Sequence, residues 1–305
     1  MSIITHQHNS PGDTHYLTLR GVNYRAEVYA DGSKLSPLPD PADADAVPTD
    51  PVGMFHRWTF KLPPVTAPSP NGSDGTTISL AVLIHPPDYP GNVTCPINST
   101  EPCGQGGDHL IAMNAATQQS AAGWDWIQGT PDRNTGIWDK VFVTSTQTPV
   151  SVLMRDPYLR TLSVHCKGEA ETNGEGDTAA VLEANAVVTN AGEAVAVVVV
   201  SVTLTDPSAN GKVVGTVESE STKIDPGTQV SLTLPTLSLA HGVKLWWPHT
   251  HGEPFLYDVR YDLLYLPAWA ASPVLVHSIS AMHGIRTIAT HVDMATMGRV
   301  FEVNG

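Results

Sequence analysis

The chain has 305 residues, a formal net charge of −14 and a pI near 5.2. This length is enough for two domains of ordinary size, each with its own hydrophobic core. The acidic balance argues against a nucleic acid or an anionic membrane surface as a partner, because neither would be attracted to the chain. The longest apolar run, Ala194–Val200, is far shorter than the roughly 20 residues of a membrane-spanning helix.

The first eight residues show no charged region followed by an apolar stretch, so no signal peptide is visible.

The sequence of the first half of the chain predicts short strands. Helical periodicity is nearly absent, and β-rich segments alternate with Pro, Gly, Asn and Asp clusters, which is typical of antiparallel sandwiches. Asp31-Gly32 predicts a tight hairpin turn. The strands predicted here are Tyr16–Leu19, Tyr24–Tyr29, Met54–Phe60, Ile78–Ile84 and Lys140–Thr144.

A polar loop in this half combines cysteines with glycosylation sequons. The sequons begin at Asn71, Asn92 and Asn98, and the last two flank Cys95. Cys95 and Cys103 favour a local disulfide over a metal site, which would need further Cys or His ligands at suitable spacing. Together these features indicate an oxidising, secretory environment for the parent protein.

The next stretch, residues 124–139, is the most unusual of the chain. Three tryptophans and four ionisable residues occupy its sixteen positions, in a protein otherwise poor in both. Indole faces stack on the C–H surfaces of sugars and carboxylates accept hydrogen bonds from hydroxyl groups, so one interpretation is a sugar site. The other interpretation is that the tryptophans are core residues and the charges cap turns. The composition alone leaves both open.

The second half predicts about seven strands with turns at near-regular spacing, which matches an immunoglobulin-like sandwich. The clearest turns are Asn190–Glu193 and Asp225–Gly227. The predicted strands are Tyr158–Cys166, Ala179–Asn190, Ala194–Leu204, Lys212–Ser221, Gln229–Leu234, Leu256–Leu264 and Pro273–Ile279. The sequence therefore predicts an all-β protein of two domains.

A set of ordered motifs resembles glycoside hydrolase family 2, in its branch of β-mannosidases and exo-β-glucosaminidases. The motifs are Gly21–Tyr29, Gly53–Phe55, His85–Asp88, Gly106–His109, Gly123–Trp126, Asp132–Val141, Leu245–Pro248, Pro254–Tyr257, Gly284–Arg286 and Gly298–Gly305. The resemblance implies a jelly-roll sugar-binding domain over residues 1–149, incomplete at its N-terminus. It further implies an immunoglobulin-like sandwich over 150–290 and, over 291–305, a lead-in to a (β/α)₈ catalytic barrel that the chain lacks.

The resemblance also assigns roles to residues. Trp124 corresponds to a side chain that stacks on the sugar, and Asp125 to one that accepts hydrogen bonds from its hydroxyl groups. Trp138 and Trp246 are expected to be packing residues. The family's acid/base glutamate directly follows an asparagine, and no Asn-Glu dipeptide occurs here, so no catalytic residue is predicted. No cofactor is implied.

No metal site is predicted either. His249 and His251 could be two zinc ligands, but an alternating pair without a third nearby ligand indicates a solvated turn instead.

Two functions fit these observations. The first is the accessory part of a retaining glycoside hydrolase that acts on β-mannosides or β-glucosaminides, with a carbohydrate and the missing barrel domain as partners. The second is a stand-alone, non-catalytic carbohydrate-binding or adhesion module. Fold-level analogy does not certify activity, and the choice between mannose and glucosamine depends on the barrel.

Overall fold

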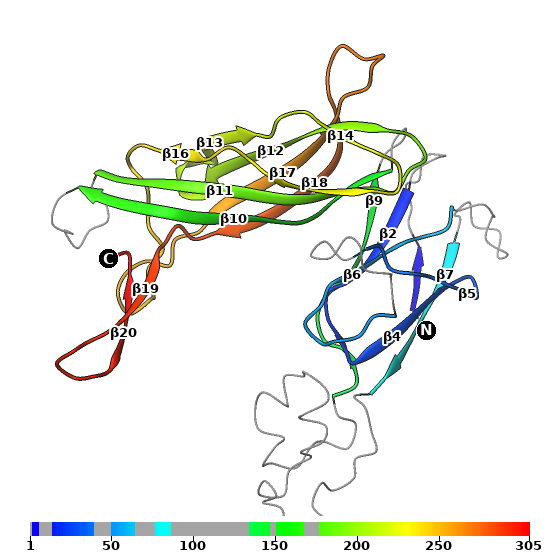
Figure 1. Ribbon diagram of the computed structural model, residues 1–305, viewed down its shortest axis with the longest axis horizontal. Helices are drawn as coiled ribbons and strands as arrows, with labels where there is room; N and C mark the ends of the chain where they lie inside the picture. The colour runs from blue at the N-terminus through cyan, green and yellow to red at the C-terminus, as the bar shows by residue number, and fades with distance from the viewer. Residues whose placement is uncertain are drawn as a thin grey trace, which may run out of the picture. The chain divides into compact units, whose positions relative to one another are not determined.

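The computed structural model describes residues 2–5, 14–39, 50–64, 77–86, 134–146, 151–167 and 177–305. The chain divides into two compact units, Met1–Gln147 and Thr148–Gly305. The all-β prediction is confirmed: in the described ranges the regular elements are strands and one 3₁₀ turn, Pro207–Ala209 (Figure 1). Nothing in these ranges forms a helix long and apolar enough to cross a membrane.

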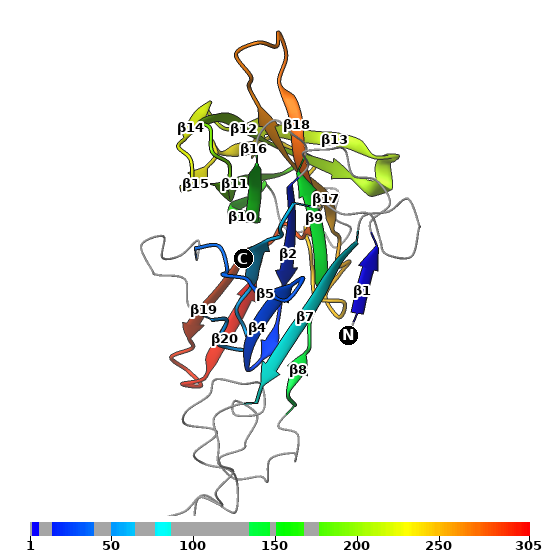
Figure 2. The ribbon, with the colours of Figure 1, turned by 90° about the vertical axis from the view of Figure 1, so that its right-hand side faces the viewer.

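The first unit is built from two main antiparallel sheets and a short ladder (Figure 2). One sheet has the order β1-β7-β4-β5, the other has the order β6-β2-β9, and β3 pairs with β8. The strands are β1 (Ser2–Thr5), β2 (Thr14–Leu19), β3 (Val22–Asn23), β4 (Arg25–Ala30), β5 (Ser33–Lys34), β6 (Trp58–Lys61), β7 (Thr77–His85), β8 (Gly136–Ile137) and β9 (Val141–Thr146).

Alternation along the strands forms the core of the first unit. In β4 every second residue is buried, as expected for a strand with one face in the core. The buried cluster comprises Leu17, Leu19, Val22, Ala26, Val28, Phe60 and Leu62. The hairpin turn predicted at Asp31-Gly32 is confirmed: both residues have positive φ, 47° and 81°, and Ala30 pairs with Ser33 on either side.

The second unit is a sandwich of two longer antiparallel sheets. One has the order β10-β11-β15, with β16 also on β11, and the other has the order β13-β12-β17-β18, with β14 also on β12. Its strands are β10 (Val152–Lys167), β11 (Asp177–Asn190), β12 (Ala196–Asp206), β13 (Lys212–Glu218), β14 (Thr222–Ile224), β15 (Gln229–Thr233), β16 (Leu237–Leu239), β17 (Tyr257–Tyr265) and β18 (Val274–His283). This arrangement is immunoglobulin-like.

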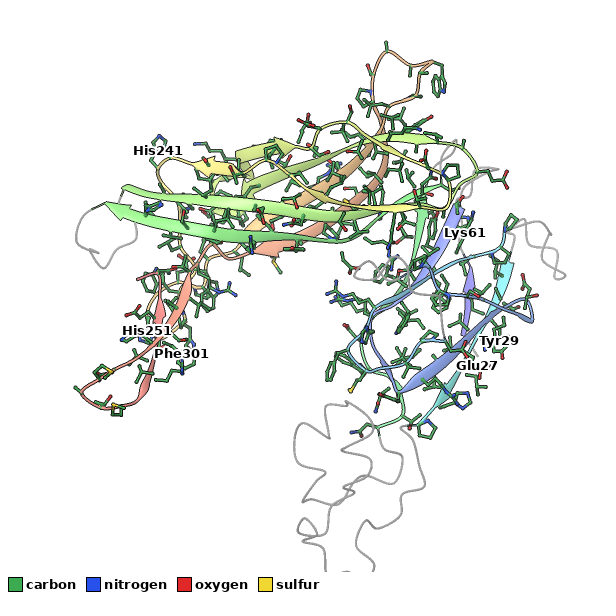
Figure 3. All side chains as sticks on the ribbon, in the orientation of Figure 1. Glu27, Tyr29, Lys61, His241, His251 and Phe301 are labelled. Carbon is green, nitrogen blue, oxygen red and sulfur yellow. The ribbon has the colours of Figure 1, made fainter. Side chains whose placement is uncertain are left out.

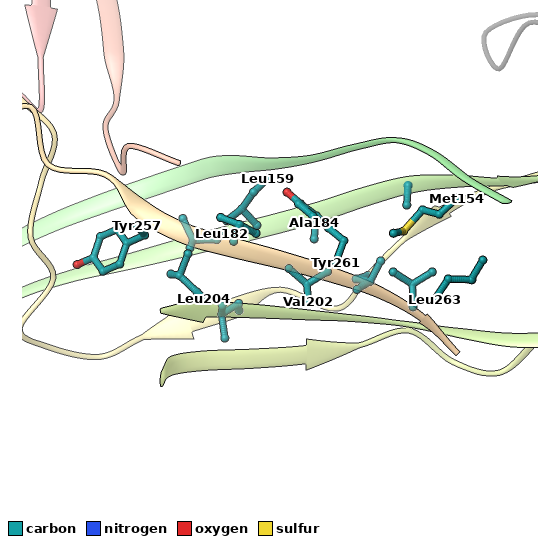
Figure 4. Close-up of a cluster of buried hydrophobic side chains, with 14 of the residues drawn as sticks. Met154, Leu159, Leu182, Ala184, Val202, Leu204, Tyr257, Tyr261 and Leu263 are labelled. Carbon is teal, nitrogen blue, oxygen red and sulfur yellow. The ribbon is translucent and has the colours of Figure 1, made fainter. Parts of the chain in front are cut away.

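Buried and partly buried residues alternate strictly along β12, which contributes to the core of the sandwich. Every second residue from Ala196 to Asp206 is buried, so the valine-rich run presents one face to the opposite sheet. Figure 4 shows Val202 and Leu204 of this strand beside Leu182 of β11 and Tyr261 of β17. Truncating such a buried aliphatic side chain to alanine typically costs about 2–5 kcal/mol.

A two-stranded hairpin, β19 (Ile288–Val292) with β20 (Arg299–Val303), extends away from the sandwich of the second unit (Figures 1 and 3). One face carries Ile288 and Phe301, which are 59% and 70% exposed. On the other face the His291 Nδ1 atom lies 3.4 Å from Glu302 Oε1. The hairpin thus exposes large hydrophobic side chains next to ionisable ones.

The predicted strands are confirmed with one correction. Met54–Phe60 was expected to be a strand throughout, but β6 begins only at Trp58, and Met54 lies in a turn. Gly53 has a φ of +106°, a conformation that a regular strand does not adopt, and the Met54 carbonyl accepts a hydrogen bond from a tryptophan side chain instead of a neighbouring strand.

Candidate functional site

The residues predicted to contact sugar, Trp124 and Asp125, lie outside the described ranges. The same holds for Cys95 and Cys103 and for the three sequon asparagines, Asn71, Asn92 and Asn98. The assignments of sugar contacts, disulfide and glycosylation therefore stay predictions. What the structure describes is the part of the first unit on either side of residues 87–133.

Both flanks of residues 87–133 are attached at the short strand β3 or at the residue that follows it. On the entering side, the Tyr24 amide donates a hydrogen bond to the His85 carbonyl (3.1 Å). On the returning side, the fully buried Asn23 donates from Nδ2 to the carbonyl of Asn134 (3.0 Å), and Asn23 pairs with Gly136 in the β3–β8 ladder. The described residues on either side of this stretch, His85 and Asn134, are thus hydrogen-bonded to the consecutive residues Tyr24 and Asn23.

Trp138, just after this returning side, is held in a fixed orientation. Its indole Nε1–H donates to the Met54 carbonyl (2.9 Å), and its backbone amide donates to the Gly21 carbonyl (3.2 Å). A Cβ atom at Gly21 would lie 2.5 Å from the indole ring, so the ring packs directly on the glycine backbone. The prediction that Trp138 packs and fixes loops is consistent with these contacts.

Sequence reasoning missed that Trp138 also forms part of an exposed aromatic pair. Trp138 is 48% exposed and Phe55 is 60% exposed, with ring centroids 6.0 Å apart in an edge-to-face arrangement. Asp139, the next residue, lies 3.4 Å from the Arg20 guanidinium. Aromatic rings beside an ion pair could stack on a sugar ring and hydrogen-bond its hydroxyl groups. The Gly53-Met54-Phe55 motif was visible in the sequence, but nothing there indicated that it meets Trp138.

A hydrogen-bonded network joins side chains of β4, β5 and β7 around Glu27. Glu27 accepts from the Tyr29 hydroxyl (2.7 Å), lies 3.0 Å from His85 Nε2 and 3.3 Å from Lys34 Nζ (Figure 3 labels Glu27 and Tyr29). The hydrogen bond from Tyr29, followed by those from His85 and Lys34, lowers the pKa of Glu27 to about 2. A carboxyl group with so low a pKa cannot serve as a general acid near neutral pH.

Two other carboxyl groups, Asp206 and Asp293, also have lowered pKa values. Desolvation by burial acts to raise the pKa of Asp206, but its hydrogen bonds with Ser208 and Lys244 together outweigh it and lower the pKa. The pKa of Asp293 is lowered by the backbone amide of Ala295 and the Thr296 hydroxyl. In the described ranges every carboxyl shift that is resolved is downward, whereas a glycosidase acid needs a raised pKa.

The candidate zinc residues do not assemble a site. His249 and His251 are both exposed, and His251 Nδ1 is hydrogen-bonded to the Thr250 hydroxyl at 2.8 Å. Within the described ranges, no group of three or more His, Cys, Asp or Glu side chains could hold a metal ion.

Similar proteins are glycosidases. Residues 164–266, in the second unit, match the family described as glycosyl hydrolases family 2. A mannosylglycoprotein endo-β-mannosidase of Lilium longiflorum is 31% identical over 297 residues, which is 95% of this chain and 26% of that protein. The resemblance predicted from the ordered motifs is thereby confirmed.

Two solved structures share the fold. The exo-chitosanase CsxA of Amycolatopsis orientalis superposes with a TM-score of 0.60 at 18% identity, covering 99% of this chain and 27% of that one. A β-glucuronidase of Bacteroides uniformis superposes with a TM-score of 0.56 at 16% identity, covering 100% and 27%. The chain thus spans about a quarter of the length of these relatives.

Proposed function

We propose that this chain, which carries a glycosyl hydrolases family 2 domain, acts as the accessory, sugar-binding and immunoglobulin-like part of a retaining glycoside hydrolase that acts on β-mannosides or β-glucosaminides. The observation that carries the proposal is the 31% identity, over 95% of the chain, to a mannosylglycoprotein endo-β-mannosidase. The substrate class follows that relative and the exo-chitosanase with the same fold.

In this proposal the first unit contributes to the sugar subsite. Trp124 stacks on a sugar ring, and Asp125 accepts hydrogen bonds from its hydroxyl groups. The attachment of both flanking segments at Asn23 and Tyr24 supports this role, because it holds His85 and Asn134 beside two consecutive residues. Fixing the ends of a binding segment reduces the entropy lost when a ligand is held.

We propose that a separate catalytic domain supplies the groups that cleave the glycosidic bond. Retaining hydrolysis requires an acid and a nucleophilic carboxylate about 5–5.5 Å apart. The pKa values of Glu27, Asp206 and Asp293 are all lowered, so these groups are ionised near neutral pH and do not suit the role of the acid. We expect a partner catalytic domain to supply the pair, and the chain alone to be inactive.

A second candidate function has its own support. The exposed Phe55–Trp138 pair next to the Arg20–Asp139 ion pair favours a chain that binds carbohydrate by itself, as a non-catalytic module. Weak binding of β-1,4-mannobiose by the isolated chain, lost on replacing Trp138 but kept on replacing Trp124, would favour this alternative.

The proposed setting is the secretory pathway. The sequons at Asn71, Asn92 and Asn98 and the predicted disulfide between Cys95 and Cys103 suit an oxidising compartment.

An exchange experiment tests the main proposal. The chain replaces the stretch of the Lilium longiflorum enzyme that it matches, and hydrolysis of an aryl β-mannoside is measured. Activity of the chimera, together with no turnover by the isolated chain, supports an accessory role. A chimera that is folded but inactive, or turnover by the isolated chain after contaminating glycosidases are excluded, contradicts it.

A further inference from the structure

The hairpin β19–β20 is joined to the sandwich through a small set of contacts around Trp246. The Trp246 amide donates to the Ile285 carbonyl (2.9 Å), and its carbonyl accepts from Asn304 Nδ2 (3.1 Å). Asn304 Oδ1 in turn accepts from the Thr287 amide (3.0 Å). The two ends of the hairpin, Thr287 and Asn304, are therefore fastened to each other and to one tryptophan.

Arg286 completes this joint. Its guanidinium lies over the Trp246 ring, 4.6 Å from the ring centroid, and it donates to the Gly284 carbonyl (3.3 Å). A Cβ atom at Gly284 would lie 2.9 Å from the Trp246 side chain, so the backbone and the ring are in direct contact there. Residues 284–287 connect the last strand of the sandwich to the hairpin. Two of them, Gly284 and Arg286, contact the Trp246 side chain.

A poorly solvated histidine precedes this connection. His283 is the last residue of β18, and its Nε2 atom is hydrogen-bonded to the Thr161 hydroxyl of β10 (3.0 Å). Desolvation, followed by repulsion from the Arg286 guanidinium, lowers the pKa of His283 to about 4. The imidazole is therefore neutral at pH 7, and a proton on it would add a second positive charge beside Arg286.

Three ionisable groups on described elements next to His283 or Trp246 are paired or neutral. On β10, Arg160 lies 2.9 Å from Glu183; in the segment before Trp246, Lys244 lies 3.0 Å from Asp206. On β17 the register partner is Tyr257, whose pKa is raised by burial, so it carries no charge at these pH values. Arg286 alone adds electrostatically to the shift at His283.

We propose that His283 makes the joint between the sandwich and the β19–β20 hairpin sensitive to acid, so that protonation releases the Arg286–Trp246 contact and frees the hairpin to move. The sign follows from linkage: since the folded-state pKa lies below the ordinary value of 6.5, stability of the joint is complete above about pH 6.5 and is lost as the pH falls towards 4. The element released carries the exposed side chains of Ile288 and Phe301.

Hydrogen–deuterium exchange of the intact chain at pH 7 and pH 4.5 tests this. After correction for the intrinsic exchange rate, amides of residues 284–304 should lose protection by roughly tens of fold at pH 4.5, more than amides of β12 in the same sample. His283→Gln should remove that difference, while His291→Gln, which alters an exposed histidine of the hairpin itself, should leave it in place. The same loss of protection in His283→Gln, or none in the wild type, would overturn the proposal.

A second measurement does not depend on a variant that folds. Titration of the His283 imidazole by NMR in the wild-type chain should give a pKa below 5, with the Trp246 indole signal shifting over the same pH range. A His283 pKa of 6 or above, or an indole signal unchanged over that range, would overturn the proposal. Neither result depends on whether the chain is part of a glycosidase.

Discussion

Asn190 is predicted to be one of the main polar determinants of stability in the second unit. Its side chain is fully buried at the end of β11. Nδ2 donates to the carbonyls of Ala194 (2.8 Å) and Ile224 (3.1 Å), and Oδ1 accepts from the Gly192 amide (3.0 Å). One side-chain amide therefore joins the turn after β11 to the end of β14.

The size of the effect follows from these three bonds. Replacing Asn190 by alanine removes all three, each worth about 0.5–1.5 kcal/mol net, so the unfolding free energy should fall by roughly 2–4 kcal/mol. The backbone bonds of Asn190, to Thr228 and Gly227 at 2.9 Å each, stay in the variant, so the loss is confined to the side chain. For a unit of this size, each kcal/mol corresponds to a Tm change of about 2–4 °C.

Urea unfolding followed by far-UV circular dichroism measures this loss, with differential scanning calorimetry as a check. The matched control is Asn185→Ala, on the same strand, where the amide bonds to Glu183 (3.3 Å) and Thr233 (2.7 Å) lie on a partly exposed face. The control should cost less than about 1 kcal/mol. If Asn190→Ala is no more destabilising than Asn185→Ala, the buried amide does not stabilise the contact between this turn and β14 as described.

Three further predictions concern other parts of the chain. His277 accepts a hydrogen bond from the Met154 amide (3.2 Å), and burial lowers its pKa to about 4. The unfolding free energy should therefore fall by up to roughly 3 kcal/mol as the pH drops from 6.5 to 4. In urea unfolding, His277→Asn should reduce this dependence of the unfolding free energy on pH. Gly21→Ala should push the indole of Trp138 aside and lower the unfolding free energy by about 1–3 kcal/mol, and an unchanged Tm would refute the contact. Mass spectrometry of the non-reduced, secreted chain should find Cys95 linked to Cys103, and free thiols on both would rule the disulfide out.

The alternation of apolar and polar residues predicted much of the second unit. The Val-rich run after Glu193 became β12, and the turns at Asn190–Glu193 and Asp225–Gly227 formed where Asn, Asp and Gly favour them. These elements were predictable because local propensity and burial favour the same conformation there.

What the sequence did not indicate depends on contacts between distant segments. The Met54 carbonyl is taken by Trp138, 84 positions further along, which no local pattern encodes. Likewise, Asn23 appears as an ordinary polar residue in the sequence, yet it is fully buried and holds the returning segment at Asn134. The role of Asp125 stays a prediction from resemblance.

The central claim, that the first unit contributes Asp125 to a sugar subsite of a β-mannoside hydrolase, is tested most directly by comparing kinetics with thermal unfolding. In the chimera with the Lilium longiflorum enzyme, Asp125→Ala should lower kcat/KM for an aryl β-mannoside by about 10–100-fold with little change in Tm. Trp269→Ala, which removes an exposed tryptophan of the second unit, should change neither quantity. If Asp125→Ala lowers Tm while the surviving protein keeps its kcat/KM, then Asp125 is a structural residue and the claim is contradicted.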